Sequence, residues 1–305
     1  MTYTDVSNKE VEELLIIAGK SSLKSIEKLA GGWANSNYLL NINDGTQLVL
    51  KIWNERTPKE VEKLVSLTCW LAEHNIPTPT PLTLGNSNKT IIKNGLTWML
   101  LPYIDADWLG YDYDSLFSLG RTQAMLHAVE TPDGIMENFS MGFKFFHQLF
   151  EVADNKDNWS PFLLQLKEEA TLLSELIPTN LPKGIIHGDL FPDNVLGRDG
   201  EVIAILDFEE SCKNYLALDI AMTFVGFGWC DGEPITERWQ AIIAGYESIR
   251  KLNESERNAL PHLHRYATLS IAAWRYWQFV INIPNTQYSD RYVEMISRLD
   301  KNLPF

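Results

Sequence analysis

Residues 184–194 read GIIHGDLFPDN and residues 205–209 read ILDFE, and these two stretches decide the fold. The first apolar run ends at Asp189, Asn194 follows five residues later, and the second apolar run ends at Asp207. Phosphoryl transfer uses this set of groups, because one carboxylate orients the acceptor hydroxyl while an amide oxygen and a second carboxylate hold magnesium. A lone aspartate is commonly a turn or helix cap, but three such residues at kinase-like spacings favour a catalytic site.

The residues before this site are rich in predicted β-structure. Asp44-Gly45 and Asn94-Gly95 are hairpin signals, and each lies between two strand-like runs. Capping boxes that start at Ser7 and Thr57 predict helices that end near residues 18 and 74. The strand-like runs cover residues 38–43, 47–53, 90–93 and 96–101.

The residues after Tyr103 are mainly helical by their hydrophobic periodicity. One β-like island interrupts them, with strands at 184–186, 194–196 and 202–206. The chain therefore predicts an α+β protein with a β-rich N-terminal lobe, residues 1–103, and a helical lobe, residues 104–305. The predicted helices cover residues 112–129, 162–176, 235–252 and 263–280.

Three motifs resemble a known family. They are GGWANSNYLL at residues 31–40, HGDLFPDNVL at residues 187–196 and WRYW at residues 274–277. Together with Asp207-Phe, the chain resembles the aminoglycoside phosphotransferase superfamily and, within it, the type II homoserine kinases. The resemblance covers essentially the whole chain and implies a protein-kinase-like two-lobe fold, with an antiparallel sheet in the first lobe.

The resemblance also implies roles for residues of the second lobe. Asp189 would be the catalytic base, and Asn194 and Asp207 would bind Mg²⁺. His187 would brace the catalytic loop, and Asp219 would stabilise that loop from the following helix. By this resemblance the chain uses ATP and Mg²⁺; whether GTP can replace ATP stays open.

Lys51 is the residue of the first lobe expected to neutralise the ATP phosphates, since the strand Leu-Val-Leu-Lys51 resembles the kinase lysine strand. The alternative is a solvated strand lysine. Its carboxylate partner is left open between Glu60 and Glu62, with Glu60 favoured. Glu60 is also the third residue of the capping box at Thr57, which is a competing role.

A nucleotide loop is expected at residues 31–37, where the resemblance places Gly32 and Ser36 near the phosphates. A plain glycine turn is the alternative. The connector at residues 100–104 is expected to present the backbone of Tyr103 and Ile104 to adenine.

Acceptor-binding residues are predicted as Asp189, Glu209, Trp229 and Arg275. Arg275 could clamp a substrate carboxylate with two hydrogen bonds, or it could stack on core aromatics. Trp229 could line the pocket or belong to the core, and acidic groups around Glu209 could meet an ammonium group.

Composition narrows the remaining function classes. Twenty-six Lys and Arg against 40 Asp and Glu give a net charge of −14, which disfavours nucleic acid as a partner. We expect a cytoplasmic protein, because no long apolar span and no secretory signal are visible. The three cysteines lack CxxC spacing, so free thiols are expected.

Three functions are weighed. The first is a kinase for a small-molecule hydroxyl, homoserine or a related amino alcohol. The second is a choline, ethanolamine or aminoglycoside kinase. The third is a pseudokinase that only binds ligands, which is disfavoured because Lys51, Asp189, Asn194 and Asp207 are all present. No pattern predicts the oligomeric state.

Overall fold

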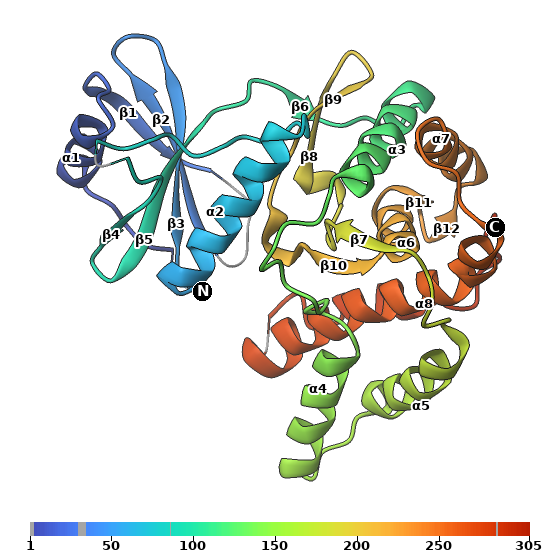
Figure 1. Cartoon of the computed structure of the whole chain (residues 1–305). Coiled ribbons are helices and arrows are strands. Elements are labelled where there is room, and N and C mark those ends of the chain that lie inside the picture. The colour runs from blue at the N-terminus through green and yellow to red at the C-terminus, as the bar shows by residue number, and fades with distance from the viewer. Residues whose placement is uncertain (1–2, 30–34, 86, 285) are drawn as a thin grey trace. The chain divides into compact units, whose positions relative to one another are not determined.

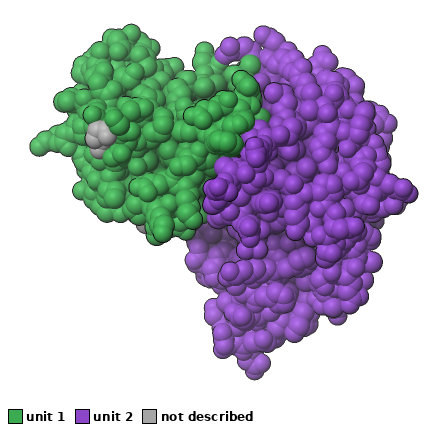
Figure 2. Space-filling view, in the orientation of Figure 1, with its two compact units in different colours: residues 1–107, 203–206 green, residues 108–202, 207–305 purple. Residues whose placement is uncertain are grey.

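A computed structural model describes residues 3–29, 35–85, 87–284 and 286–305 of the chain. It divides into two compact units (Figure 2). Unit 1 comprises residues 1–107 and 203–206, and unit 2 comprises residues 108–202 and 207–305.

Unit 1 is built around a five-stranded antiparallel sheet in the order β1-β2-β3-β5-β4 (Figure 1). The predicted turns at Asp44-Gly45 and Asn94-Gly95 are confirmed, and both glycines adopt the positive φ that such turns require. The strands are β1 (Leu23–Lys28), β2 (Asn35–Ile42), β3 (Gln47–Trp53), β4 (Ile91–Lys93) and β5 (Leu96–Pro102).

Two helices cover the two faces of this sheet. Helix α1 (Asn8–Ile17) packs Leu14 and Leu15 with Leu40, Leu50 and other residues of one face. Helix α2 (Pro58–Glu73) packs Val61, Leu64 and Val65 with Trp53 and Met99 of the other face. Both helices begin at the predicted capping boxes, so these two predictions are confirmed. Alternation of side chains along β3 separates the two cores.

Unit 2 is mainly helical (Figure 1). Its helices are α3 (Tyr113–Ala128), α4 (Phe143–Asn155), α5 (Pro161–Leu176), α6 (Leu216–Phe227), α7 (Thr236–Glu247), α8 (Glu254–Tyr276) and α9 (Arg291–Ile296), with a π-helical turn at Trp277–Asn282. Its short strands are β7 (Lys183–Ile186), β8 (Val195–Arg198), β10 (Cys212–Tyr215), β11 (Trp229–Cys230) and β12 (Glu233–Pro234). Strands β6 (Asp107–Trp108) and β9 (Glu201–Ile205) contain residues of both units.

Several elements differ from the sequence prediction. Helix α6 is buried along nearly its whole length, so its sequence is apolar on all sides and shows no helical period. Helix α8 begins at Glu254 rather than at residue 263, because Asn253 and Glu256 form a capping box and the helix tolerates Pro261. Helix α4 and the β11–β12 hairpin were not predicted, although Asp231-Gly232 is a hairpin signal.

No helix in the described part of the chain combines the length and the apolar character that crossing a membrane requires.

Candidate active site

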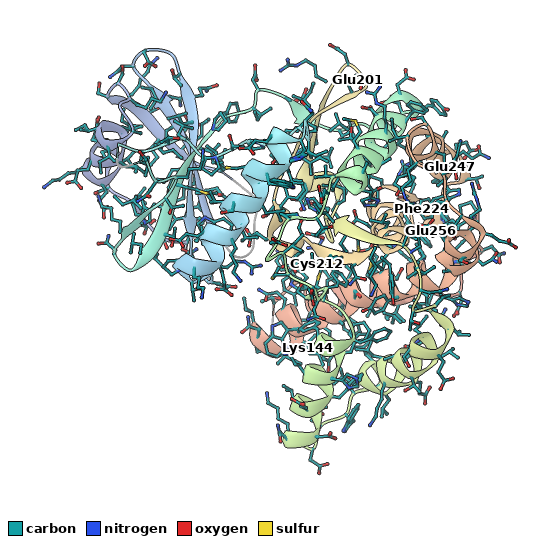
Figure 3. The ribbon with its side chains drawn as sticks, in the orientation of Figure 1. Lys144, Glu201, Cys212, Phe224, Glu247 and Glu256 are labelled. Atoms are coloured by element: carbon teal, nitrogen blue, oxygen red, sulfur yellow. The ribbon has the colours of Figure 1, made fainter. Side chains whose placement is uncertain are left out.

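The predicted catalytic loop begins directly after strand β7. This strand pairs antiparallel with β10, with Ile186 opposite Cys212 (Figure 3 labels Cys212), and ends directly before His187. A 3₁₀ turn at Pro192–Asn194 then brings Asn194 back to Asp189. Asn194 Nδ2 donates to the Asp189 carbonyl oxygen at 2.8 Å and to Asp189 Oδ2 at 3.3 Å. The structure therefore brings two of the predicted site residues together.

Gly188 and His187 shape the backbone before Asp189. Gly188 has φ +80°, and a Cβ built there would lie 2.8 Å from the Glu210 carbonyl oxygen. The position therefore requires glycine. The His187 ring is buried against Phe208, with ring centroids 4.8 Å apart, and its Nδ1 accepts from the Asp189 backbone N–H at 3.2 Å.

Asp219, in the first turn of α6, fixes the same backbone from the other side. Its Oδ1 accepts from Gly188 N at 2.7 Å and its Oδ2 accepts from His187 N at 3.1 Å. Burial raises the pKa of Asp219, but hydrogen bonding and charge from His127 outweigh it, so the pKa lies below its usual value. Asp219 is thus an ionised carboxylate that holds the loop, as the sequence predicted.

Asp207 follows β9 and has left-handed backbone angles, φ 60° and ψ 63°. This conformation is uncommon for a residue other than glycine and is found at functional sites. The Asp207 side chain is exposed, whereas Phe208 is buried on the His187 ring. Glu209 and Glu210 follow in a 3₁₀ turn, and Glu210 accepts a hydrogen bond from the Ser140 hydroxyl.

Negative charge gathers around Asp189. Burial, followed by the charges of Asp193, Glu210 and Asp207, raises the pKa of Asp189 to about 8. Carboxylates placed so close to one another favour a bound cation.

Asn194 and Asp207 fit a magnesium ion. Asn194 turns its NH₂ group to Asp189, so its amide oxygen is the atom left for a cation, and Asp207 adds a carboxylate. Mg²⁺ prefers oxygen ligands and takes one or two carboxylates together with substrate phosphates and water. Within the described ranges no three His, Cys, Asp or Glu side chains form a group that could hold a metal ion.

Lys51 lies on the face of the unit 1 sheet that α2 covers. Its register partner on β5 is Met99, and its Nζ lies 4.2 Å from the centroid of the Trp53 ring. Leu64 and Val65 of α2 pack in the same cluster as Trp53 and Met99. Apolar residues therefore occupy the part of α2 that faces the lysine strand.

Glu60 caps helix α2, which is the role predicted as the alternative to pairing with Lys51. Its Oε2 accepts from Thr57 N at 2.8 Å and from Thr57 Oγ1 at 2.7 Å. These hydrogen bonds lower the pKa of the Glu60 carboxyl. Pairing of Lys51 with Glu60 or Glu62 stays a prediction.

Within the predicted nucleotide loop at residues 31–37, Asn35, Ser36 and Asn37 belong to β2 and pair with β3, and the role of this segment in nucleotide binding stays a prediction. Ser36 is fully buried, and its Oγ accepts from Thr4 N at 2.8 Å and from Asn54 Nδ2 at 3.0 Å. The Ser36 hydroxyl is therefore engaged within unit 1. Gly32 lies outside the described residues.

Tyr103 and Ile104 directly follow β5. The Tyr103 N–H donates to the Gln47 carbonyl at 3.2 Å, and the Ile104 carbonyl accepts from Ala106 N at 3.0 Å. The first bond holds the connector against β3 and the second lies within the connector itself, whose contact with adenine stays a prediction.

Two predicted acceptor residues have structural partners in unit 2. Trp229 is buried and stacks on His264, with ring centroids 5.8 Å apart. The Arg298 guanidinium carbon lies 4.8 Å from the centroid of the Trp229 ring. Arg275 donates to Glu294 Oε2 at 2.8 Å and to the Arg291 carbonyl at 3.0 Å, so it joins α8 to α9. These contacts favour packing for Trp229 and an internal ion pair for Arg275.

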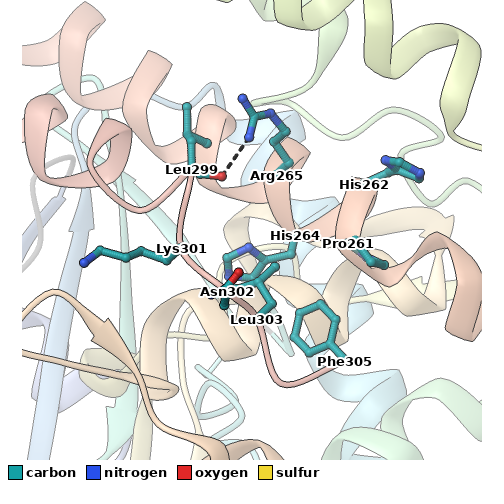
Figure 4. A pocket seen from close by; sticks show the side chains of 9 residues that line it. All are labelled: Pro261, His262, His264, Arg265, Leu299, Lys301, Asn302, Leu303 and Phe305. Carbon is teal, nitrogen blue, oxygen red and sulfur yellow. Dashed lines mark hydrogen bonds between the residues drawn. The ribbon is translucent and has the colours of Figure 1, made fainter.

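A pocket of about 300 Å³ lies in unit 2 beside α8 and the C-terminal segment (Figure 4). Two basic side chains that line the pocket are already paired: Arg265 makes a bidentate ion pair with Glu169, and Lys301 pairs with Glu233. None of the predicted site residues lines it. We therefore place the candidate active site at Asp189.

The sequence analysis missed three buried side chains that hold Asp219. Gln123 and His127 on α3 bond its carboxylate directly, at 2.9 and 3.0 Å, and Tyr246 on α7 bonds His127. Gln123 and His127 lie 96 and 92 residues from Asp219 in the sequence, and Tyr246 lies 119 residues from His127, so no local motif marks them.

Comparison with known proteins agrees with this geometry. The family model described as "Phosphotransferase enzyme family" (APH) matches residues 25–252, well over half of the chain. The chain belongs to the APH phosphotransferase family. A homoserine kinase from Gluconacetobacter diazotrophicus is 30% identical over 290 residues, which cover 91% of this chain and 88% of that protein.

Two solved structures share the fold of this APH family member. One is the amicoumacin kinase hAmiN in complex with AMP-PNP, Ca2+ and Ami, with a TM-score of 0.75 at 14% identity, covering 98% of this chain and 96% of that chain. The other is a microcompartment-associated aminopropanol kinase, with a TM-score of 0.73 at 17% identity, covering 96% and 95%. The protein-kinase-like α+β fold and the class of small-molecule kinase are thus confirmed.

Proposed function

We propose that this APH family member transfers the γ-phosphoryl group of ATP, with Mg²⁺, to the hydroxyl of homoserine or a related amino alcohol. The observation that carries the proposal is the setting of Asp189, which Asn194 holds through two hydrogen bonds and whose preceding backbone Asp219 fixes. Unit 1 would supply the nucleotide-binding residues, Lys51 among them, and unit 2 the catalytic and acceptor-binding residues.

In the proposed reaction Asp189 orients the acceptor hydroxyl and takes its proton. The acceptor oxygen forms a bond to the γ-phosphorus while the bond between that phosphorus and the β–γ bridging oxygen breaks, and ADP leaves. Magnesium held by Asn194 and Asp207 would neutralise charge on the phosphates. The same cation would offset the neighbouring carboxylates that raise the pKa of Asp189, and so favour its ionised form.

The acceptor is proposed to carry an ammonium group. Glu209 and Glu210 both lie in a segment that builds the site, and Glu210 raises the pKa of Asp189. Homoserine is the first candidate, because the homoserine kinase compared above matches over most of both chains. Choline, ethanolamine and aminoglycosides also carry cationic groups, so kinases for them are the alternative.

A panel of acceptors tests the proposal. Release of ADP is measured at saturating Mg·ATP with L-homoserine, ethanolamine, choline, 1-amino-2-propanol and kanamycin. We expect the highest kcat/KM for L-homoserine and a phosphate monoester in the ³¹P NMR spectrum. L-2-Aminobutyrate, which lacks only the hydroxyl of homoserine, is the matched control and should release no ADP above background. Turnover with another alcohol and none with homoserine would overturn the homoserine assignment.

A further inference from the structure

A chain of hydrogen bonds, buried except at the half-buried Arg250, leads from Asp219 to the start of α8. Asp219 Oδ2 contacts His127 Nε2 at 3.0 Å, and His127 Nδ1 contacts the Tyr246 hydroxyl at 2.7 Å. Arg250 Nη1 reaches the same hydroxyl at 3.1 Å, while its Nη2 donates to Glu256 Oε1 at 2.7 Å (Figure 3 labels Glu256). The chain thus crosses α3, α6, α7 and the N-terminus of α8.

The helix pair that carries this chain is packed backbone to backbone. A Cβ at Gly120 of α3 would lie 2.0 Å from the Ile242 carbonyl oxygen, and a Cβ at Gly245 of α7 would lie 1.9 Å from the Phe117 carbonyl oxygen. Two glycines therefore allow a close approach of α3 and α7. This approach brings Tyr246, the residue after Gly245, against His127.

The two ends of the chain set the direction of its outer hydrogen bonds. The ionised Asp219 can only accept, so His127 Nε2 donates to it. Arg250 has no acceptor atom, so the Tyr246 oxygen accepts from it, and the same hydroxyl is hydrogen-bonded to His127 Nδ1. Burial raises the pKa of Tyr246, which keeps this hydroxyl protonated. Arg250 in turn is held by Glu256, which is fully buried.

We propose that Tyr246 and Arg250 are positioning residues for Asp189. They fix the orientation of His127, His127 orients the Asp219 carboxylate, and that carboxylate fixes the two N–H groups just before Asp189. The inference rests on the proposed role of Asp189 as the base, and neither Tyr246 nor Arg250 needs to contact a substrate. A misplacement of about 1 Å at a reacting group can cost 100-fold in rate, so small changes in this chain should be visible in kcat.

A double-mutant cycle tests the inference. Tyr246→Phe keeps the ring and removes the hydroxyl, and we expect kcat to fall about 10- to 100-fold while the KM for ATP stays within about twofold. In the Asp189→Asn background the same substitution should cost less than about threefold, because a positioning residue acts only through the group that it positions. Tyr276→Phe is the matched control: it removes a buried hydroxyl that bonds Ser160, and it should leave kcat unchanged.

Hydrogen exchange gives a second, independent measurement. Tyr246→Phe should speed deuterium uptake in peptides that contain His187 and Gly188 and leave the peptides of β2 and β3 unchanged. Arg250→Lys keeps the charge but cannot reach Tyr246 and Glu256 together, so it should show the same changes to a smaller degree, and it serves if Tyr246→Phe does not fold.

The outcomes separate this inference from the proposed function. An equal kcat loss in both backgrounds, unchanged kcat, or faster exchange throughout the chain would overturn the positioning role. Wild-type turnover in Asp189→Asn alone would instead overturn the role of Asp189.

Discussion

Gly188 is the residue of the candidate site where a side chain has no room. Its φ is +80°, and a Cβ would lie 2.8 Å from the Glu210 carbonyl oxygen. Gly232 shares the left-handed backbone, with φ +79°, but a Cβ there meets nothing within 4 Å. The two glycines therefore separate the cost of the backbone conformation from the cost of the contact.

Gly188→Ala should lower both stability and turnover. The backbone conformation alone costs roughly 1–2 kcal/mol for an alanine, and the contact with Glu210 adds to it and shifts Asp189. We expect Gly232→Ala to show only the first cost, with normal kcat. Urea unfolding and steady-state kinetics on both variants measure this; equal losses of stability with full turnover in Gly188→Ala would show that the contact does not matter.

At the residue scale, the sequence was informative where partners are close in the chain. Asp189 and Asn194 are five residues apart and meet within one turn, so their spacing was enough to assign them to one site. Ser36 and Arg275 have partners at distances of 18 to 32 residues and 16 to 19 residues. The chemistry of a side chain limits what it can bind, but the fold chooses among the possible partners.

Among the elements, capping boxes and hairpin turns were predicted well because they are local. Helices α1 and α2 begin where Ser7 and Thr57 cap them. Hydrophobic periodicity did not predict helix α6, because this helix is surrounded by protein and needs no polar face. The contact of α3 with α7 was also beyond the sequence, since isolated glycines inside helices do not reveal which backbone approaches them.

Gly245→Ala tests that helix contact through the sign of its effect. In an open helix the change from glycine to alanine stabilises by roughly 0.5–1 kcal/mol. Here the added methyl group would lie 1.9 Å from the Phe117 carbonyl oxygen, and overpacking typically costs about 1–3 kcal/mol. We expect a net loss, measured as a lower urea midpoint at an unchanged slope. A more stable variant would contradict the close packing.

For the whole molecule, the β-rich first part and the helical second part were visible as a change of hydrophobic period near residue 103. The family was predictable because the residues around Asp189 and Asp207 are chemically constrained and lie in short continuous motifs. The acceptor was not predictable, because residues that are far apart in the sequence meet around the site, as Ser140 and Glu210 do. Their meeting depends on the packing of the whole unit.

The central claim is that Asp189 is the base of a phosphotransferase, and comparing it with its neighbour Asp193 tests it most directly. Asp193 also adds negative charge near Asp189, but its side chain is exposed and it lies in a turn. Turnover of wild type, Asp189→Asn and Asp193→Asn is measured with the best acceptor at saturating Mg·ATP.

Loss of a general base typically costs about 10²–10⁴ in rate, so kcat of Asp189→Asn should fall by that factor with little change in the KM for ATP. Asp193→Asn should stay within a few-fold of wild type. Turnover of Asp189→Asn equal to that of Asp193→Asn, with both proteins folded, would contradict the account.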